Sequence, residues 1–520
     1  MQTAVLPQPT PDPTLNVAID TINKKKQALV FVNTKRSAEK TAEELSKRIK
    51  TSDPALKEIS EKVLKALPRP TAQCERLARC VKKGVAFHHA GLTHKQKELV
   101  EENFKLKVIK VICATPTLAM GVDLPAFRSI IRDLRRFGHR GMQFIPVLEY
   151  LQMAGRAGRP KFDSWGEAIC IAKSEGEKDK IKEMYIEGEP EDIYSKLAVE
   201  PVLRTYLLSL VASGFVCTEK QVFDFFKRTF WAYQFEDFSK IEAIIERMLH
   251  LLEQWRFIKG SKQEDSDFVS ANQIRDGRYR ATVLGKRVAE LYIDPLTAHN
   301  MIEALERAGS SRSINEFSYL HMICYTLEMR PLLSVRTKEW DDIQERLIQY
   351  ETYFIEPEPS MYEPEYDDFV KAVKTTFMFM DWIDEKDEEF ILEHYSARPG
   401  ELRIKLSIAD WLLYAADELC RILNLKAQIR EIRKLRLRVK AGAREELLPL
   451  LRLEGIGRVR ARKLFNNKIR AIKDVKEARL PTLTQLLGSK TALKVKEQVD
   501  ETVKPVKKGK RKGQVSLKKF

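Results

Sequence analysis

The chain has 520 residues, which is enough for three or four domains that each bury a core. No apolar run reaches the ~20 residues of a membrane span, and the proline-rich start does not resemble a signal peptide. The net charge is +17, and most of it lies near the C-terminus. Residues 421–503 hold 22 basic and 9 acidic side chains, and residues 504–520 hold eight basic and none acidic. This segregation favours nucleic acid as a partner over a generally basic surface.

The seven cysteines are scattered and include no C-x-x-C pair. Reduced, mostly buried thiols are therefore expected, with no metal site and no disulfides. We expect a cytoplasmic protein that makes no contact with a membrane.

In chain order, residues 1–14 carry four prolines and are predicted to form an extended linker. Strand-like apolar runs follow in residues 15–194, at residues 28–33, 85–87, 108–114 and 168–172, and a helical pattern covers residues 38–49. Strands that alternate with helices predict a parallel α/β sheet. Its functional residues should lie at the carboxyl ends of the strands.

The remaining chain is predicted to be mainly helical. In residues 195–294, amphipathic helices are expected at residues 202–212, 219–230 and 241–255, with a small wing formed by residues 257–258 and 279–283. Together they predict a winged-helix domain. A helical domain at 295–428 and a compact basic helical domain at 429–503 follow, and residues 504–520 are too charged to fold alone.

The segment 149–160 reads Glu-Tyr-Leu-Gln-Met-Ala-Gly-Arg-Ala-Gly-Arg-Pro. Its spacing can bring Gln152, Arg156 and Arg159 to one nucleotide phosphate. A fixed guanidinium stabilises a phosphoryl-transfer transition state by roughly 10³–10⁵ in rate. A surface Arg-Gly turn is the simpler alternative, but the flanking residues favour catalysis.

About thirty residues upstream lies the segment 114–125, Ala-Thr-Pro-Thr-Leu-Ala-Met-Gly-Val-Asp-Leu-Pro. The Thr115 hydroxyl and the backbone at Gly121 suit contact with a phosphate, and Asp123 could reach a ribose or the first arginine of the downstream motif. No Gly-x-x-x-x-Gly-Lys-Ser/Thr loop occurs in the 520 residues. The two segments therefore predict half of an ATPase site, inactive until a first motor domain supplies the rest in cis or in trans.

In order and separation, these two segments resemble the fifth and sixth motifs of superfamily 2 helicases. Together with residues 193–204, they resemble the second motor domain and winged-helix entry of archaeal Ski-like DNA helicases of the Hjm type. The resemblance implies a multidomain fold, in which a RecA-like α/β motor domain precedes a winged helix, an all-α ratchet domain and a helix-hairpin-helix domain. It also implies ATP-driven 3′–5′ translocation on single-stranded DNA and unwinding of forked DNA in replication-coupled repair.

The resemblance further implies that ATP with Mg²⁺ is held mainly by the first motor domain. On this chain, the nucleotide would be contacted by Gly121, Asp123, Gln152, Arg156 and Arg159. The DNA track would include Phe31, Asn33, His89, Gly91 and Thr115.

Residues 132–146 hold two strand-like arms around Gly138 and Gly141, where the family has a wedge hairpin. Phe137 or Phe144 could stack on the last base pair, and Arg136 belongs to a cluster that could hold phosphates. A solvated basic loop is the alternative without the resemblance.

The amphipathic segment 400–414 matches the ratchet helix of the family, whose arginine and tryptophan touch successive bases. Arg403 and Trp411 are the candidates here, although the family spacing favours position 404, which is Ile404. On sequence alone, Trp411 is an equally good core anchor.

Residues 453–464 resemble a helix-hairpin-helix, in which Gly455 and Gly457 would let the backbone approach a phosphate. Arg458, Arg460 and Lys463 would add positive charge. At the C-terminus, Gln514, Leu517 and Phe520 resemble a Q-x-x-L-x-x-F motif that binds the sliding clamp (PCNA).

Two other functions are compatible with the sequence. One is an RNA helicase of the Ski-like group, which the helix-hairpin-helix and the clamp-like tail argue against. The other is a non-enzymatic DNA-binding remnant. We expect an archaeal, nucleoid-associated monomer.

Overall fold

The computed structural model describes residues 5–51, 53–138, 141–158, 164–235, 237–260, 278–310 and 313–500. The chain divides into two compact units. Residues 1–281 and 387–405 make the first unit, and residues 282–386 and 406–520 make the second.

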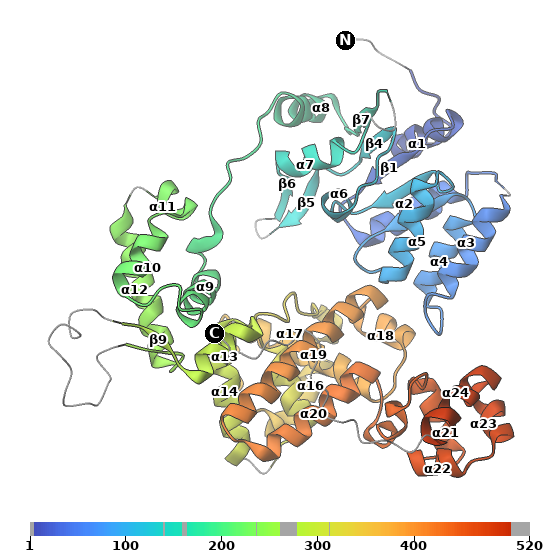
Figure 1. Cartoon of the computed structure of the whole chain (residues 1–520). Coiled ribbons are helices and arrows are strands. Elements are labelled where there is room, and N and C mark those ends of the chain that lie inside the picture. Colours follow the sequence, from blue (N-terminus) through green and yellow to red (C-terminus); the bar gives the residue numbers. More distant parts are fainter. Residues whose placement is uncertain are drawn as a thin grey trace, which may run out of the picture. The chain divides into compact units, whose positions relative to one another are not determined.

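A parallel sheet forms the core of the first unit (Figure 1). Its strand order is β2-β3-β1-β4-β7, and the strands are β1 (Ala28–Phe31), β2 (Val85–His88), β3 (Val111–Ala114), β4 (Arg128–Ile131) and β7 (Glu167–Cys170). Four of these strands confirm the predicted apolar runs. β4 was not predicted, because Arg128 and Ser129 interrupt its apolar pattern. Both are buried through partners distant in the sequence: Arg128 pairs with Asp20 and Glu167, and the Ser129 hydroxyl donates to the Met153 carbonyl at 2.7 Å.

Helices surround the sheet: α1 (Pro13–Asn23), α2 (Lys35–Ser46), α3 (Pro54–Leu64), α4 (Ala72–Val81), α5 (His94–Lys105), α6 (Thr117–Gly121), α7 (Val147–Ala154) and α8 (Glu175–Ile181). Side-chain caps fix several of their starts, as at Asp12, Thr34 and Thr93. The Asp12 cap starts α1 at Pro13, so the predicted linker ends two residues earlier than expected.

A hairpin extends from the same domain, with strands β5 (Arg135–Gly138) and β6 (Gly141–Phe144), as the sequence predicts. The next helices are α9 (Glu200–Ala212), α10 (Glu219–Phe226), α11 (Phe230–Gln234) and α12 (Phe238–Gln254). Strands β8 (Ile258–Lys259) and β9 (Arg280–Ala281) pair antiparallel as the predicted wing. The predicted helix 219–230 is in fact α10 followed by α11.

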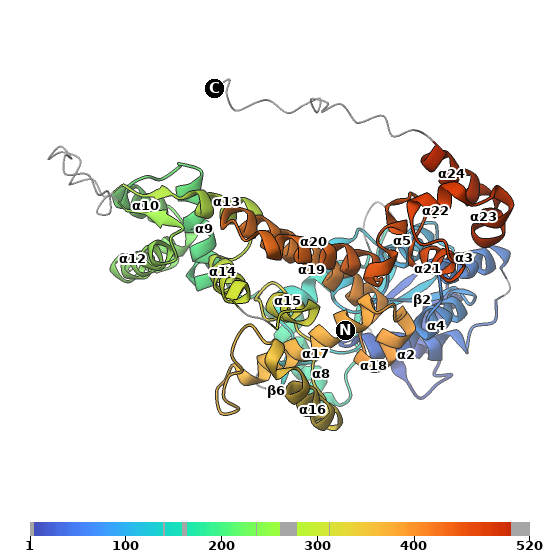
Figure 2. The same ribbon diagram turned by 90° about the horizontal axis from the view of Figure 1, so that it is seen from below.

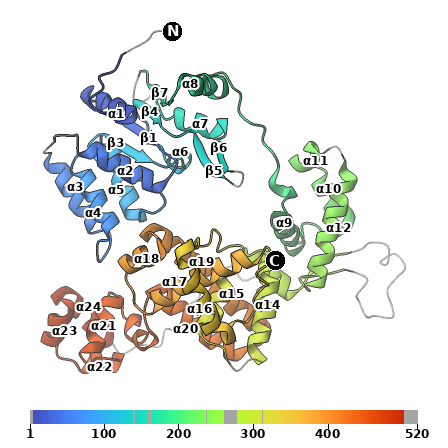
Figure 3. The same ribbon diagram turned by 180° about the vertical axis from the view of Figure 1, so that it is seen from behind.

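In its described residues, the second unit consists of helices and their connections, without strands (Figure 3). Its first part contains α13 (Val283–Leu291), α14 (Pro295–Ser310), α15 (Glu316–Cys324), α16 (Trp340–Tyr350), α17 (Tyr366–Ile383) and α20 (Lys426–Ala441). The segment assigned to the first unit contains α18 (Glu388–Tyr395) and the start of α19 (Pro399–Ile422), a single helix of 24 residues that ends in the second unit.

A separate apolar core, running from Ala443 to Val499, holds the last four helices together. These are α21 (Arg458–Asn466), α22 (Ile472–Glu477), α23 (Leu480–Leu487) and α24 (Ser489–Asp500).

Candidate nucleotide and nucleic-acid site

The two predicted helicase motifs lie side by side in the first unit. Arg156 follows the end of α7, and its guanidinium donates to the carbonyl of Val122 at 2.6 Å and to that of Ala119. Its backbone carbonyl accepts from Ala126 at 3.0 Å. Burial lowers the pKa of Arg156, and within the described part of the chain its buried Nε–H has no acceptor. Arg156 therefore fastens the loop after α6 to the end of α7.

The turn after Arg156 requires glycine. Gly158 has φ +61°, and a Cβ there would lie 2.5 Å from the backbone nitrogen of Gly166. Gln152, Gly121 and Asp123 are exposed nearby, where they are accessible to a ligand. Arg159 lies outside the described residues.

The proposed track residues sit at the carboxyl ends of β1, β2 and β3. Phe31 and His89 are 1% and 0% exposed, and the buried Thr115 hydroxyl bonds to that of Thr117 at 2.9 Å. Asn33 is half-buried and donates through Nδ2 to the Arg135 carbonyl at 3.2 Å, at the base of the hairpin. These four residues lie near one another at the strand ends. Asn33 has a partly exposed side chain, whereas the other three side chains are buried.

Sequence reasoning missed an ionic network behind His89. The carboxylate of Glu39 on α2 is 2% exposed and contacts His89 Nε2 at 3.1 Å, Arg398 Nε at 3.0 Å and Arg76 Nη1 at 2.6 Å. Burial opposes ionisation of Glu39, but the hydrogen bond from His89 and the charge of Arg398 outweigh it and lower the pKa to about 2. Arg398 is 359 residues away along the chain, so no sequence pattern indicated the contact.

The same network docks the start of α19 on the loop after β2. The amide of Gly400 donates to the carbonyl of Gly91 at 3.0 Å. A Cβ at Gly400 would lie 2.2 Å from the Leu92 carbonyl oxygen, and one at Gly91 would lie 2.2 Å from Arg398 Cδ. Gly91 therefore lies beneath this segment, and a Cβ added there would point at Arg398 rather than into solvent.

On the hairpin, Phe137 is 80% exposed and Met142, directly opposite in register, is 58% exposed. Phe144 lies at the base, where the Arg135 guanidinium is 4.2 Å from its ring and the Tyr185 ring is 6.3 Å away. Arg136 pairs with the buried Glu149 at 2.8 Å. The structure thus presents Phe137 outward and uses Phe144 as a brace. Sequence reasoning missed Met142, although its position two residues before Phe144 places both side chains on the same face of β6.

On α19, the half-buried Trp411 donates through Nε1 to the Leu291 carbonyl at 2.9 Å. Arg403 is exposed and lies 3.3 Å from a Glu388 carboxylate oxygen. Ile404, at the spacing usual in the family, is 51% exposed.

The predicted helix-hairpin-helix has Gly455 at φ +84° and Gly457 as the N-cap of α21, with open space where a Cβ would lie. Exposed Arg460 donates to the Gly455 carbonyl at 2.7 Å, and Lys463 is exposed on the same helix. Arg458 differs, because it lies 4.2 Å from the Trp382 ring and donates to the Lys386 carbonyl at 3.0 Å. It docks this domain against the end of α17. The clamp-like residues Gln514, Leu517 and Phe520 lie outside the described residues.

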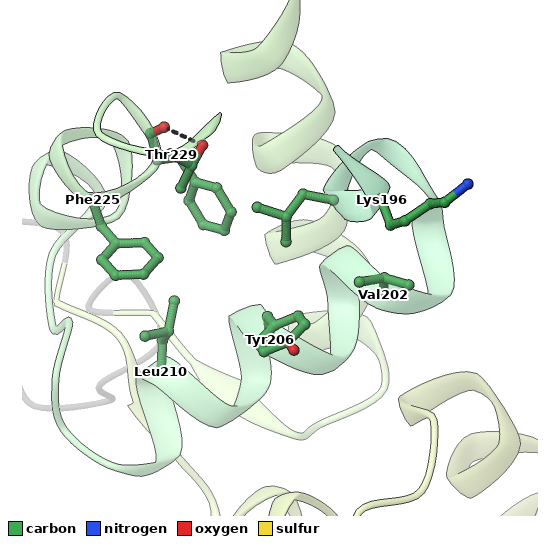
Figure 4. A pocket seen from close by; sticks show the side chains of 8 residues that line it. Lys196, Val202, Tyr206, Leu210, Phe225 and Thr229 are labelled. Atoms are coloured by element: carbon green, nitrogen blue, oxygen red, sulfur yellow. Dashed lines mark hydrogen bonds between the residues drawn. The ribbon is translucent and has the colours of Figure 1, made fainter. Parts of the chain in front are cut away.

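An apolar pocket of about 340 Å³ lies beside α9 and α10 (Figure 4). Its lining includes Tyr206, Leu210 and Phe225, with Lys196 at one side and Thr229 at the other. None of the predicted site residues lines it. Among the described residues, no group of three or more His, Cys, Asp or Glu side chains could hold a metal ion, and no described helix is both long and apolar enough to span a membrane.

The first unit combines a parallel α/β sheet with the two adjoining motif segments, and three family models match parts of the chain. Residues 13–161 match the helicase conserved C-terminal domain, residues 166–259 a helix-turn-helix domain, and residues 317–442 domain 4 of archaeal helicases.

The chain is also similar over most of its length to curated proteins named ATP-dependent DNA helicase Hel308. The protein of Methanocella arvoryzae is 38% identical over 501 residues, 95% of this chain and 65% of the relative. That of Methanococcus vannielii is 37% identical over 88% of this chain and 64% of the relative, and that of Pyrococcus horikoshii is 38% identical over 94% and 66%. The chain thus spans somewhat less than two thirds of the length of these relatives.

Proposed function

We propose that this chain is the part of an ATP-dependent 3′–5′ DNA helicase of the Ski-like, Hjm type that follows the first motor domain. It would act on forked DNA in replication-coupled repair. One observation carries the proposal: the domain in which Arg156 joins the two predicted motifs also bears a braced hairpin with Phe137 exposed at 80%. The similarity to proteins named ATP-dependent DNA helicases supports it.

ATP with Mg²⁺ would bind between this domain and a first motor domain supplied in cis or in trans. Hydrolysis of ATP supplies the free energy for movement. The residues here fit such a ligand, since Gln152 is exposed and Arg156 keeps one N–H without an acceptor among the described residues. Gly121 and Asp123 lie on the loop that Arg156 holds, and Arg159 would add a second guanidinium to the γ-phosphate.

Single-stranded DNA would run along the carboxyl ends of the strands, past Asn33, and then along α19 past Arg403 and Trp411. Phe137 would stack on the last base pair of the fork, with Met142 beside it. Gly455, Gly457, Arg460 and Lys463 would hold a phosphate at the helix-hairpin-helix without reading sequence. The tail could in addition bind a sliding clamp.

The test is DNA-stimulated ATP hydrolysis by this chain alone and after addition of a separately expressed first motor domain from a relative. Activity in the mixture, lost in Arg159→Ala and reduced in Arg156→Ala, is the expected result. Hydrolysis by the chain alone, or equal activity with Arg159→Ala, would contradict the proposal. Parallel assays on DNA and RNA forks distinguish the DNA helicase from an RNA helicase.

A further inference from the structure

The parallel sheet of the first unit has a second edge, opposite the one that carries the predicted site. The register of the strands places Ala28, Val85 and Val111 level with one another at this amino edge. Helices α1, α4 and α5 end shortly before these three strands, and α4 and α5 lie next to β2 (Figure 2). Neighbouring strands are about 4.8 Å apart, so the three connecting loops lie within about 10 Å of one another.

Lysine dominates these three loops. Residues 24–27, 82–84 and 105–110 contain eight lysines and no acidic residue. We call the eight the amino-edge lysine cluster: Lys24, Lys25, Lys26, Lys82, Lys83, Lys105, Lys107 and Lys110. They come from three separate parts of the sequence, and the fold brings them to one edge.

Hydrogen bonds join the loops to one another. The Ala28 amide donates to the Lys110 carbonyl at 3.0 Å, and the Lys110 amide donates to the Gly84 carbonyl at 2.8 Å. The side chain of Gln27 donates to the Phe104 carbonyl at 2.7 Å. The cluster is therefore one continuous surface rather than three unrelated charge runs.

Most of the positive charge of the cluster is not neutralised. Four of its exposed lysines form no ion pair and no side-chain hydrogen bond within the described part of the chain: Lys25, Lys82, Lys105 and Lys107. Lys24 pairs with Asp20 at 2.8 Å, and the exposed Glu102 lies one turn before the end of α5. Eight lysines beside these two carboxylates leave a strongly positive surface.

Two of the lysines occupy positions where glycine is usual. Lys25 and Lys107 have φ of 58° and 59° and follow the ends of α1 and α5, and Gly84, with φ 73°, has the same place after α4. A side chain in this left-handed conformation costs about 1–2 kcal/mol. A cation near a helix C-terminus recovers about 0.3–1 kcal/mol of that cost, and the effect falls off beyond the last turn. Helix stability therefore does not account for lysine at these two positions.

The composition of the loops favours duplex DNA as the ligand. Lysine is depleted in protein–protein interfaces. None of the three loops carries an aromatic residue on which an unpaired base could stack, and the exposed Trp165 belongs to the loop before β7, on the other side of β4. Over about 10 Å, a duplex presents about six phosphate charges, twice as many as a single strand.

We propose that the amino-edge lysine cluster binds the phosphodiester backbone of duplex DNA, through charge and without reading sequence. The inference rests on the proposed function for its ligand. It adds a duplex-binding surface at the edge of the sheet opposite the predicted single-strand track, where a paired arm of a fork is held.

The test measures the affinity of the full chain for a fluorescein-labelled blunt duplex by anisotropy over a range of salt concentrations. The variant that combines Lys25→Gly with Lys107→Gly removes two cations and gives each position the residue that its φ favours, so its thermal unfolding temperature should not fall. The salt slope should fall by about 1.8, which is about 0.9 for each phosphate no longer neutralised. Affinity at about 0.1 M salt should fall roughly tenfold or more.

The matched control combines Lys40→Gln with Lys65→Gln. It removes two exposed lysines of the same unit, one on α2 and one at the end of α3, and should bind the duplex as the unaltered chain does. Both variants are also titrated with a labelled oligothymidylate. The glycine variant should bind this single strand as tightly as the unaltered chain.

The proposal is overturned if the glycine variant binds the duplex as tightly as the glutamine control, because the lysines are then a solvated face or contact an acidic protein. It is also overturned if affinity for the oligothymidylate falls as much as affinity for the duplex, because the edge then holds single strands. Failure of the proposed function is distinguishable, since it appears as absence of DNA-stimulated ATP hydrolysis when the unaltered chain is mixed with a first motor domain. The glycine variant should keep that hydrolysis when a single strand is the stimulant.

Discussion

Glu39 is almost completely buried, yet its carboxylate stays ionised because His89, Arg398 and Arg76 surround it. Arg156 is a comparable case. It was predicted to face a nucleotide, but two of its N–H groups donate to backbone carbonyls of the same domain. At the residue scale, the partner decides the role of each charged group. The sequence supplied the residue types of the site, but not these partners.

The buried histidines and Glu39 make stability dependent on pH. Burial lowers the pKa of His89, and it lowers the pKa of His321 to about 3. The His321 ring therefore stays neutral in the folded protein, and both rings take up a proton more readily in the unfolded chain, where a histidine has an ordinary pKa of about 6.5. The free energy of unfolding should therefore decline as the pH falls from 6.5, and Glu39 adds a further loss as the pH falls below 4.5 towards 2.

This dependence can be measured as the urea midpoint of unfolding at several pH values between 7 and 5. His321→Leu removes one of the titrating groups and should show a smaller decline than the unaltered chain. His250→Gln, at an exposed position, should decline as the unaltered chain does. A His321→Leu midpoint that falls just as steeply would contradict the assignment.

At the element scale, apolar runs identified four strands, and two glycines between strand-like arms, together with the family resemblance, indicated the hairpin. Each of these signals is a local pattern. The sequence did not predict β4, because Arg128 and Ser129 are buried by partners that only the folded chain brings near. It did not predict the docking of Arg398 and Gly400 on the loop after β2 for the same reason. Within the hairpin, both phenylalanines were candidates, and burial against Tyr185 separates Phe144 from Phe137.

Phe137→Ala should leave stability within about 0.5 kcal/mol, because the side chain is largely exposed. In the reconstituted helicase it should reduce unwinding of a forked duplex while DNA-stimulated ATP hydrolysis persists. Phe144→Ala should instead destabilise the protein, since it removes the contacts with Arg135 and Tyr185. Equal unwinding by Phe137→Ala and the unaltered protein would remove Phe137 from the wedge.

A further prediction at this scale concerns Gly400, at the start of α19, and Gly91, on the loop against which it packs. Gly400→Ala places a methyl group against two backbone oxygens and should cost about 1–3 kcal/mol or more. Gly91→Ala meets mainly the Arg398 side chain, which can move, and should cost less. Thermal unfolding measures both, with Gly176→Ala, which meets nothing within 4 Å, as control. The reverse order would show that this docking is not tight.

At the scale of the whole molecule, residues 421–520 are strongly basic and the rest of the chain is slightly acidic. Affinity for DNA should therefore fall steeply with salt. A chain that ends at residue 503 should show a smaller salt slope, by about 0.7 for each phosphate of a single strand that the tail no longer neutralises. Anisotropy titrations check this, with a full-length control whose eight basic tail residues are replaced by glutamine. An unchanged slope would assign the phosphate neutralisation to other cations.

α19 is one unbroken helix of 24 residues, and its first turn is pinned at Gly91 and Glu39. At 1.5 Å per residue it is a rod of about 36 Å. After Gly400 it contains neither proline nor glycine, so its own sequence offers no hinge before the last turn. A glycine introduced midway should lower the stability of this helix by roughly 1 kcal/mol.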